Sequence, residues 1–230
     1  MIILITGTRK GIGRYLAEYY LDNGNIVIGL SRKSSDLHNI NYQHYEADIS
    51  DEKSIIQIFS EIRKKYKKLD VLINNAGINP SISPLLLQTL EIVKKTFDTN
   101  VYGTILMCRE AVKLMMKNSY GRIINLSSMA VKHEVEGESV YTSSKASVNS
   151  FSRVIAKEIY QLGITCNVIA PSAIETDLMK AVNSDALQEV LNKNVIKAKG
   201  NFEDVSNIID FLIKKESKSI TGQIIYLGGV

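Results

Sequence analysis

Several residue types are scarce in this chain, and each scarcity excludes a class of protein. Its 230 residues include no tryptophan, three prolines, three histidines and two cysteines. Because cysteine and histidine are so few and no CxxC spacing occurs, no metal centre is expected. Cys108 and Cys166 lie far apart in apolar surroundings, which predicts two buried, reduced thiols and no disulfide framework.

Long apolar runs are absent as well. No stretch approaches the roughly 20 apolar residues that a membrane-spanning helix needs, so no membrane partner is expected. The apolar start, Met1 to Thr6, lacks a basic leader and a small-residue cleavage site, and it predicts a strand and not a signal peptide. We therefore expect a cytoplasmic protein.

Charge of one sign is concentrated in one place only. The net charge is +4, and much of the excess lies in the run Arg63 to Lys68. Cations are favoured near the C-terminus of a helix, so this run is typical of a solvated helix end. The alternative is a nucleic-acid or membrane patch, but no basic or aromatic cluster elsewhere supports it, and no nucleic-acid partner is expected.

The chain does contain a regular alternation of short apolar runs and longer amphipathic stretches. The runs are β-branched and nearly continuous, as in buried parallel strands. The predicted strands are 2–6, 26–30, 71–75, 123–126, 164–170 and 223–227. Apolar residues recur at helical spacing between them, and residues 101–115 predict one long buried helix.

This alternation predicts an α/β fold in which helices cover both faces of a parallel sheet. No linker or repeat divides the chain, so residues 1–230 are predicted to form a single dinucleotide-binding and catalytic domain. Residues 177–200 interrupt the alternation late in the chain, and they predict a helical flap over the substrate.

A glycine-rich turn follows the first predicted strand. Gly7, Gly11 and Gly13 form a GxxxGxG spacing just before a predicted helix. Glycines let a backbone approach a ligand closely, and the N–H groups at a helix N-terminus favour a pyrophosphate. The spacing differs from the GxGxxG of the standard dinucleotide fingerprint, and a tight turn without a ligand is the alternative.

The end of the second predicted strand indicates which dinucleotide binds. An acidic residue there would bind the ribose hydroxyls of NAD. This strand instead runs into Ser31-Arg32-Lys33, and Arg9 in the glycine-rich turn is a second basic candidate. Because guanidinium groups suit a phosphate dianion, the pattern predicts NADP(H). Two exposed arginines without a ligand are the alternative.

Tyr141 and Lys145 stand four residues apart in a predicted helix, which stacks them on one face. A free tyrosine has a pKa of about 10, and a nearby ammonium group lowers that pKa toward the range useful for acid–base catalysis. A YxxxK pair arises often by chance, so this pair needs support from other residues.

That support comes from a series of motifs in order along the chain. They are TGTRKGIG (6–13), Asp48-Ile49, NNAG (74–77), Asn100, Ser128 and YTSSK (141–145). Together they resemble the short-chain dehydrogenase/reductase family over nearly the whole chain. The stretches GRIINLSS (121–128) and SITGQIIYLGG (219–229) look most like 3-oxoacyl-[acyl-carrier-protein] reductases. The resemblance implies a Rossmann-type doubly wound sheet of about seven strands, in the order 3-2-1-4-5-6-7, and a homodimer or homotetramer.

The resemblance also implies four catalytic residues. Tyr141 would protonate a carbonyl oxygen or deprotonate an alcohol, and Lys145 would hold the nicotinamide ribose and lower the tyrosine pKa. Ser128, rather than its neighbour Ser127, would hydrogen-bond the substrate oxygen where negative charge develops. Asn100 would hold a water molecule in a proton relay to solvent.

The cofactor contacts implied by the resemblance cover four regions of the chain. The turn would wrap the pyrophosphate, and the segments after the second to fourth strands would meet the adenosine and its ribose. The loop after the sixth strand would meet the nicotinamide. The residues are Gly7, Thr8, Arg9, Lys10, Gly11, Ile12, Gly13, Ser31, Arg32, Asp48, Ile49, Asn75, Ala76, Gly77, Tyr141, Lys145, Pro171, Ile174 and Thr176.

One position departs from the family pattern. Ser172 follows Pro171 where relatives usually have glycine. If that glycine has a positive φ, serine would cost roughly 1 kcal/mol, and the loop would be expected to shift.

The sequence therefore predicts an NADPH-dependent oxidoreductase that exchanges hydride between nicotinamide and a small ketone or secondary alcohol. A 3-oxoacyl thioester is the first substrate to consider. A sugar or nucleotide-sugar dehydrogenase/reductase is an alternative, since residues 79–83 are polar. A non-catalytic NADP(H) sensor is a further alternative, and the presence of all four catalytic residues argues against it.

Overall fold

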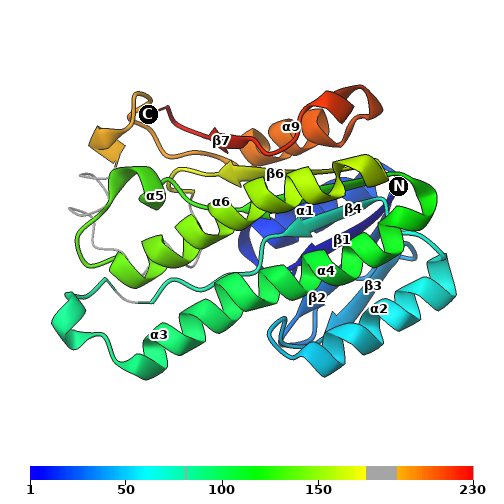
Figure 1. The fold of residues 1–230 in the computed structure, drawn as a ribbon, viewed down its shortest axis with the longest axis horizontal. Helices are drawn as coiled ribbons and strands as arrows, with labels where there is room; N and C mark the ends of the chain where they lie inside the picture. The colour runs from blue at the N-terminus through cyan, green and yellow to red at the C-terminus, as the bar shows by residue number, and fades with distance from the viewer. Residues whose placement is uncertain (81, 175–190, 230) are drawn as a thin grey trace.

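The computed structural model describes residues 1–80, 82–174 and 191–229. Within these ranges, seven strands form one parallel sheet in the order β3-β2-β1-β4-β5-β6-β7 (Figure 1). The strands are β1 (Ile2–Thr6), β2 (Ile26–Ser31), β3 (Tyr42–Glu46), β4 (Val71–Asn74), β5 (Gly121–Leu126), β6 (Ile164–Ala170) and β7 (Ile224–Tyr226). The predicted fold class and strand order are confirmed.

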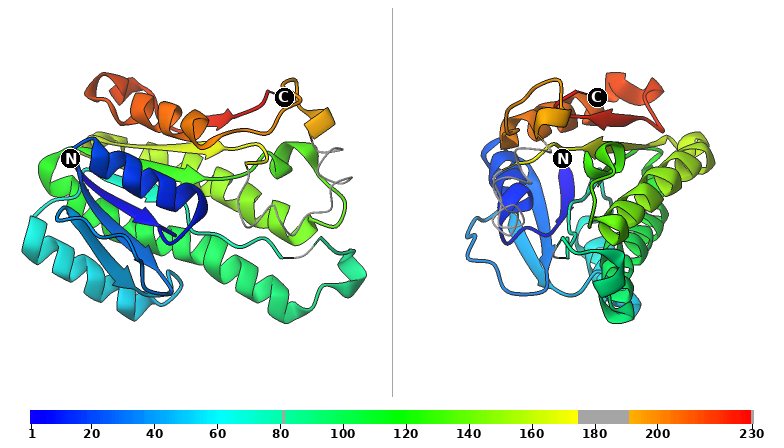
Figure 2. Two further views of the ribbon diagram at one scale, coloured as in Figure 1. Left: turned by 180° about the vertical axis from the view of Figure 1, so that it is seen from behind. Right: turned by 90° about the vertical axis from the view of Figure 1, so that its left-hand side faces the viewer.

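Helices cover both faces of the sheet (Figures 1 and 2). The helices α2, α4 and α6 pack on one face, whereas α1 and α9 pack on the other. The described α-helices are α1 (Gly11–Asp22), α2 (Glu52–Tyr66), α3 (Leu90–Phe97), α4 (Thr104–Met115), α5 (Ala130–His133), α6 (Ser139–Ile159) and α9 (Phe202–Ile213).

Successive residues of each central strand enter opposite cores, because side chains alternate along a strand. In β1, Leu4 packs with the α2, α4 and α6 side, whereas Ile3 and Ile5 pack with α1 and α9. All three are fully buried, and each such burial stabilises the fold by roughly 1.5–3 kcal/mol. The continuous apolar runs in the sequence therefore reflect burial on both faces.

A polar contact joins the two helices of the second face. Asp210 on α9 accepts hydrogen bonds from the hydroxyls of Tyr19 and Tyr20 on α1, and the Tyr20 bond is 3.0 Å long. The hydrogen bond to Asp210 raises the pKa of Tyr19 to about 12. Tyr15 stacks on Phe202 beside this contact, with ring centroids 5.2 Å apart.

The structure corrects the prediction of one long helix over 101–115. The helical rod in this region starts earlier, at Leu90, and a π-helical turn, Asp98–Gly103, separates α3 from α4. Figure 1 shows α3 and α4 as one nearly continuous rod. Val154 on α6 is 53% exposed.

Three further expectations concern the two cysteines, the flap and membrane-spanning helices. Cys108 and Cys166 are buried free thiols, as predicted. The predicted flap over 177–200 lies largely outside the described residues, which resume at Leu191. None of the helices in the described ranges is both long and apolar enough to span a bilayer.

Candidate active site

The glycine-rich turn joins β1 to α1 at the carboxyl edge of the sheet. Gly7 and Gly11 have φ values of +78° and +60°, which L side chains rarely adopt. Gly13 lies so close to the turn that a Cβ there would come within 2.4 Å of the Gly7 carbonyl oxygen. The glycines therefore let the start of α1 fold back against the end of β1, as a phosphate-binding turn requires.

Thr6 and Asn75 tie this turn to the neighbouring strand β4. The Asn75 amide donates to the Thr6 carbonyl over 2.9 Å. The Thr6 hydroxyl accepts hydrogen bonds from the backbone N–H groups of Asn75 (3.0 Å) and Ala76 (2.9 Å). Strand order reverses between β1 and β4, and ligands of such sheets bind at this crossover. Thr6 opens the TGTRKGIG motif, but sequence reasoning gave it no role, because its hydrogen bonds reach a strand far along the chain.

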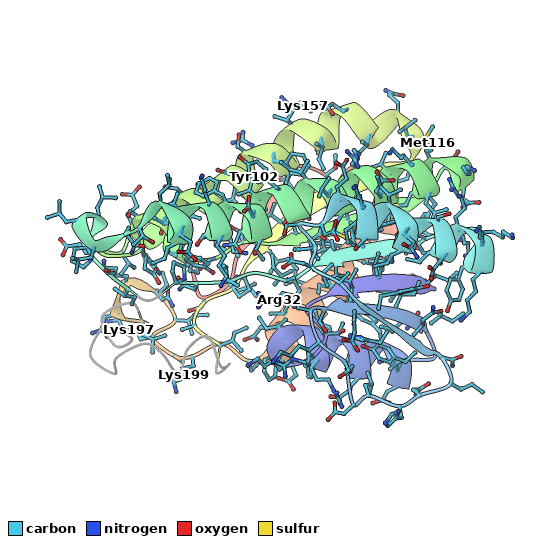
Figure 3. All side chains as sticks on the ribbon, turned by 90° about the horizontal axis from the view of Figure 1, so that it is seen from below. Arg32, Tyr102, Met116, Lys157, Lys197 and Lys199 are labelled. Atoms are coloured by element: carbon cyan, nitrogen blue, oxygen red, sulfur yellow. The ribbon has the colours of Figure 1, made fainter. Side chains whose placement is uncertain are left out.

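A cavity of about 690 Å³ opens at this crossover. Its walls come from the turn, from the end of β2, and from the segments after β3 and β4. Figure 3 shows Arg32 at this edge, where β2 ends. The lining residues are Gly7, Arg9, Lys10, Gly11, Ile12, Leu30, Ser31, Arg32, Lys33, Ala47, Asp48, Ile49, Asn75, Ala76, Gly77, Ile78 and Thr99.

The cavity fits a dinucleotide that carries an extra phosphate. The wall at the end of β2 has Arg32 and Lys33, and the turn adds Arg9. The carboxylate of Asp48 is occupied by the backbone N–H and the hydroxyl of Ser50, at 2.9 and 2.7 Å. Basic groups thus face the cavity where an NAD-binding site would have an acid.

Several predicted cofactor residues lie outside the cavity lining. Thr8 is fully buried, and its hydroxyl lies 3.0 Å from the Tyr42 hydroxyl. Gly13 shapes the turn from behind, and Ile174 is 5% exposed in the core beside α9. The Pro171 carbonyl accepts from the Met129 N–H. Thr176 lies outside the described residues.

The predicted tyrosine and lysine lie on α6, beyond the inner end of the cavity. The Lys145 ammonium is 5.9 Å from the centroid of the Tyr141 ring and donates to the Leu126 carbonyl over 2.9 Å. Ser127 turns to the α6 backbone, where its hydroxyl donates to the Lys145 carbonyl at 3.4 Å. Ser128 instead acts on the Tyr141 phenol, whose pKa it lowers against the larger effect of burial, and its Oγ accepts from the Ala130 N–H over 3.1 Å. The structure therefore brings Ser128, and not Ser127, to the tyrosine.

Burial shifts the pKa values of both groups. Desolvation lowers the pKa of Lys145 to about 8. Burial raises the pKa of Tyr141 to about 12, against a smaller lowering by the Ser128 hydrogen bond. The predicted lowering of the tyrosine pKa by Lys145 is therefore not what this geometry produces, because the ammonium bonds to Leu126 and the desolvation of the phenol dominates.

Asn100 lies in the π-helical turn between α3 and α4. Its amide donates to the Ile78 carbonyl (2.9 Å) and to the Ser144 hydroxyl (3.0 Å), and its Oδ1 accepts from the Ile78 N–H. Its carbonyl accepts from the Thr104 hydroxyl. The side chain therefore joins the loop after β4 to α6, and the predicted water relay stays a prediction.

Gly77 marks the meeting point of the cavity and the catalytic residues. A Cβ at this position would lie 3.2 Å from the Lys145 Nζ and 3.3 Å from the Asn100 Oδ1. Because Gly77 also lines the cavity, a ligand there can approach both groups. The four predicted catalytic residues thus converge at one end of the predicted cofactor site.

Known proteins share this arrangement over almost the whole chain. A family model described as enoyl-(acyl carrier protein) reductase matches residues 7–229. The 3-oxoacyl-[acyl-carrier-protein] reductase FabG of Escherichia coli (strain K12) is 31% identical, over 99% of this chain and 96% of that protein.

Solved structures agree with these relatives. ElxO with NADP bound superposes with a TM-score of 0.90 at 31% identity, covering 98% of this chain and 96% of that one. The ligand-free aldohexose dehydrogenase of Thermoplasma acidophilum gives a TM-score of 0.89 at 26% identity, covering 99% and 92%.

The chain belongs to the short-chain dehydrogenase/reductase family. The predicted family and enzyme class are confirmed: this short-chain dehydrogenase/reductase is an oxidoreductase that acts on CH–OH groups.

Ser172 is the position where this short-chain dehydrogenase/reductase departs from the expected Pro-Gly pattern. Its φ is not positive, so the predicted strain is absent. Its hydroxyl accepts a hydrogen bond from the Asn194 amide over 2.7 Å, and the Asn194 Oδ1 lies 2.7 Å from the His133 Nε2. Through Asn194, the serine thus ties the loop after β6 to the described part of the predicted flap and to α5.

Proposed function

We propose that this chain is an NADP(H)-dependent reductase of 3-oxoacyl thioesters. One observation carries the catalytic part of the proposal: Lys145 and Asn100 meet at Gly77, which lines the cofactor-sized cavity, and Tyr141 lies beside Lys145 with Ser128 next to its phenol. A protein that only sensed NADP(H) would have no use for this set.

NADP(H) is the cofactor. Arg9, Arg32 and Lys33 line the cavity, and no acid takes the place of Arg32 at the end of β2. ElxO, a neighbour with the same fold, has been solved with NADP bound. When it is bound, the nicotinamide supplies or accepts the hydride.

The chain's own residues supply the proton and hold the carbonyl. The Tyr141 phenol is protonated at neutral pH, because burial raises its pKa to about 12, so it is a donor for a carbonyl oxygen that gains negative charge. The Ser128 hydroxyl, which acts on the Tyr141 phenol, would hydrogen-bond the same oxygen and stabilise that charge.

Lys145 would hold the cofactor ribose and return a proton to Tyr141. With a pKa of about 8, its ammonium gives up a proton more readily than an exposed lysine does. Asn100 is predicted to pass protons onward through a bound water molecule. In this structure its side chain fixes Ile78 and Ser144 around the site.

An exposed apolar segment that comes soon after the cavity-lining residues 75–78 in the chain favours an acyl substrate. It follows Ile78 in the chain and consists of Ile82, Leu85, Leu86, Leu87 and Leu90, which are 40–95% exposed. An acyl chain would cover apolar surface that now faces water. The E. coli relative is named as a reductase of 3-oxoacyl groups on acyl carrier protein.

A sugar ketone or alcohol is the second candidate. An aldohexose dehydrogenase shares the fold at 26% identity. The polar loop near the site also fits, but the Asn79 amide is bonded to the Glu138 carboxylate over 3.0 Å. This internal contact leaves less of the loop's hydrogen-bonding capacity for hydroxyl groups of a substrate.

The assembly and the location are also proposals. We infer a homodimer or homotetramer, because Tyr102 (55% exposed) and Val154 (53%) present apolar surface on the outer side of the π-turn and of α6. Figure 3 shows Tyr102 and Met116 along the α3–α4 rod, with Lys157 on α6 beside it. The cytoplasmic location stays a prediction, which fractionation of the native cells would test.

A substrate panel followed by NADPH absorbance tests the proposed function. Acetoacetyl thioesters should be reduced, with rates that rise for longer 3-oxoacyl chains. Turnover of aldohexoses without turnover of thioesters would favour the second candidate. NADPH binding with no turnover of any ketone or alcohol would favour the sensor.

A further inference from the structure

A row of hydrogen-bonded side chains runs behind the cofactor cavity, on the edge strand β3. The Tyr42 hydroxyl lies 3.0 Å from the Thr8 hydroxyl and 2.9 Å from the His44 Nδ1. The His44 Nε2 lies 3.1 Å from the Ser31 hydroxyl and 3.1 Å from the Lys33 carbonyl. The row thus starts in the phosphate turn and ends beside Arg32.

The direction of these bonds follows from their last member. In the arrangement that gives the Lys33 carbonyl two donors, it accepts from the Ser31 hydroxyl over 2.8 Å and from a protonated His44 Nε2. In the neutral ring the Nδ1 then accepts from Tyr42, and the Tyr42 oxygen accepts from Thr8.

A glycine in β2 leaves room for the hydrogen bond between Tyr42 and Thr8. Gly29 lies in the interior of β2, and a Cβ there would come within 2.1 Å of the Tyr42 hydroxyl oxygen and 2.6 Å of the Thr8 Oγ1. Glycine normally weakens a strand, and it is used where another group must approach closely. Gly29 therefore gives Tyr42 access across β2 to the turn.

We propose that Tyr42 and His44 are positioning residues that set the preference for NADP(H) over NAD(H). They hold the Ser31–Lys33 segment at a fixed place relative to the phosphate turn, so the basic groups of both walls face one phosphate. This inference rests on the proposed cofactor. It concerns residues that line no part of the cavity themselves.

The physical reason is preorganisation. Arg32 is exposed and lies in a short segment after β2, where a free chain would sample many positions. Bonds from Ser31 and His44 to the Lys33 carbonyl remove that freedom before the ligand arrives, which lowers the entropic cost of binding. Only a dinucleotide with the extra phosphate at this wall binds more tightly because of this lowered cost.

Isosteric substitutions test the inference with the full-length protein. Tyr42→Phe removes one hydroxyl, and His44→Phe keeps a ring but loses both nitrogens. Tyr45→Phe is the matched control, because Tyr45 is on the same strand but packs against the opposite core, where its hydroxyl accepts from the Gln43 amide. The dissociation constants of NADPH and NADH are measured by fluorescence titration without substrate.

We expect His44→Phe and Tyr42→Phe each to weaken NADPH binding about fivefold, the equivalent of roughly one hydrogen bond, and NADH binding less than twofold. The double variant should lose no more than the larger single loss, and His44→Gln, which keeps a donor and an acceptor, should recover most of the affinity. Tyr45→Phe should bind like wild type. Turnover at saturating NADPH should persist in all variants.

Three results would overturn the inference: equal losses for NADPH and NADH, no loss in either variant, or additive losses in the double variant. A wild-type protein that prefers NADH would instead overturn the proposed cofactor, and the two failures are thereby distinguishable.

Discussion

At the scale of single residues, burial favours the neutral forms of both ionisable groups at the site. It lowers the pKa of Lys145 to about 8 and raises that of Tyr141 to about 12. The tyrosine is therefore ready to donate a proton, and the lysine is charged at neutral pH at a cost to stability. Catalytic groups with such shifts are characteristic of functional sites.

The first prediction concerns the proton donor. Tyr141→Phe should reduce kcat at least about a hundredfold, because no other described hydroxyl takes its place beside Ser128. NADPH affinity should change little, since the phenol is distant from the phosphate walls. Steady-state kinetics and a binding titration check both parts, with Tyr160→Phe at the exposed end of α6 as the control. Retained turnover would mean that another group donates the proton.

The second prediction concerns the cost of the buried lysine. At pH 7, holding Lys145 charged at 5% exposure costs up to about 3 kcal/mol, and loss of its bond to Leu126 offsets about 1 kcal/mol of any gain. Lys145→Met should therefore raise Tm by a few degrees while turnover is lost.

The pH dependence of that gain has a definite sign. Between pH 8 and 10.5 the unfolded wild type binds a proton that the folded state has released, so wild-type stability rises with pH in this window. The advantage of Lys145→Met should shrink from pH 7 toward pH 10. Thermal melts at several pH values measure it, and a constant advantage would contradict the assigned shift.

Residue roles could be predicted from sequence only where a motif marks them. Tyr141, Lys145, Ser128 and Asn100 were found because they stand at characteristic intervals. Thr6 and His44 were not, since each acts through one or two contacts with residues far away in the sequence. The hydrogen bond of Ser172 could not be predicted either, because the sequence does not show that Asn194 lies beside it.

At the scale of elements, the buried strands could be predicted well because both their faces are apolar. β1 and β6 have the predicted bounds, and β2, β4, β5 and β7 differ by one or two residues at their ends. β3 could not be found from periodicity, because an edge strand reading Tyr-Gln-His-Tyr-Glu resembles a polar loop. The π-helical turn left no pattern either, and the Asn100 bonds to Ile78 and Ser144 within it join residues far apart in the sequence.

The third prediction tests the contact between α1 and α9. Asp210→Ala should destabilise the fold by about 1–3 kcal/mol, because Tyr20 is 2% exposed and would lose the acceptor of its hydroxyl. Urea denaturation measures this, with Asn207→Ala on the exposed side of α9 as the control. Equal stability of the two variants would show that the tyrosine hydroxyls find water instead.

At the scale of the whole molecule, the net charge is only +4. The positive electrostatic potential is concentrated at the cavity, which Arg9, Arg32 and Lys33 line. A cleft lined by one sign of charge attracts a ligand of the opposite sign, and salt screens the attraction.

The fourth prediction follows from this field. Raising NaCl from about 50 mM to about 300 mM should weaken NADPH binding more than NADH binding, because the extra phosphate gains most from the basic wall. Arg32→Ala should reduce the difference, and Lys157→Ala on α6 should leave it unchanged. Binding titrations in both salts decide it. The same salt dependence for both dinucleotides would place the extra phosphate away from Arg32.

The position of β3 at the margin of the sheet has a consequence for how such enzymes change over generations. Among the described strands it pairs with β2 alone, and its side chains are half-buried or exposed, so they reach the two cores only at their margins. A lineage, or a protein engineer, can therefore alter dinucleotide preference by substituting outer residues such as Tyr42 while the turn and the catalytic residues stay as they are. The residues that set dinucleotide preference thus lie where substitution is tolerated, whereas the catalytic residues lie where it is not.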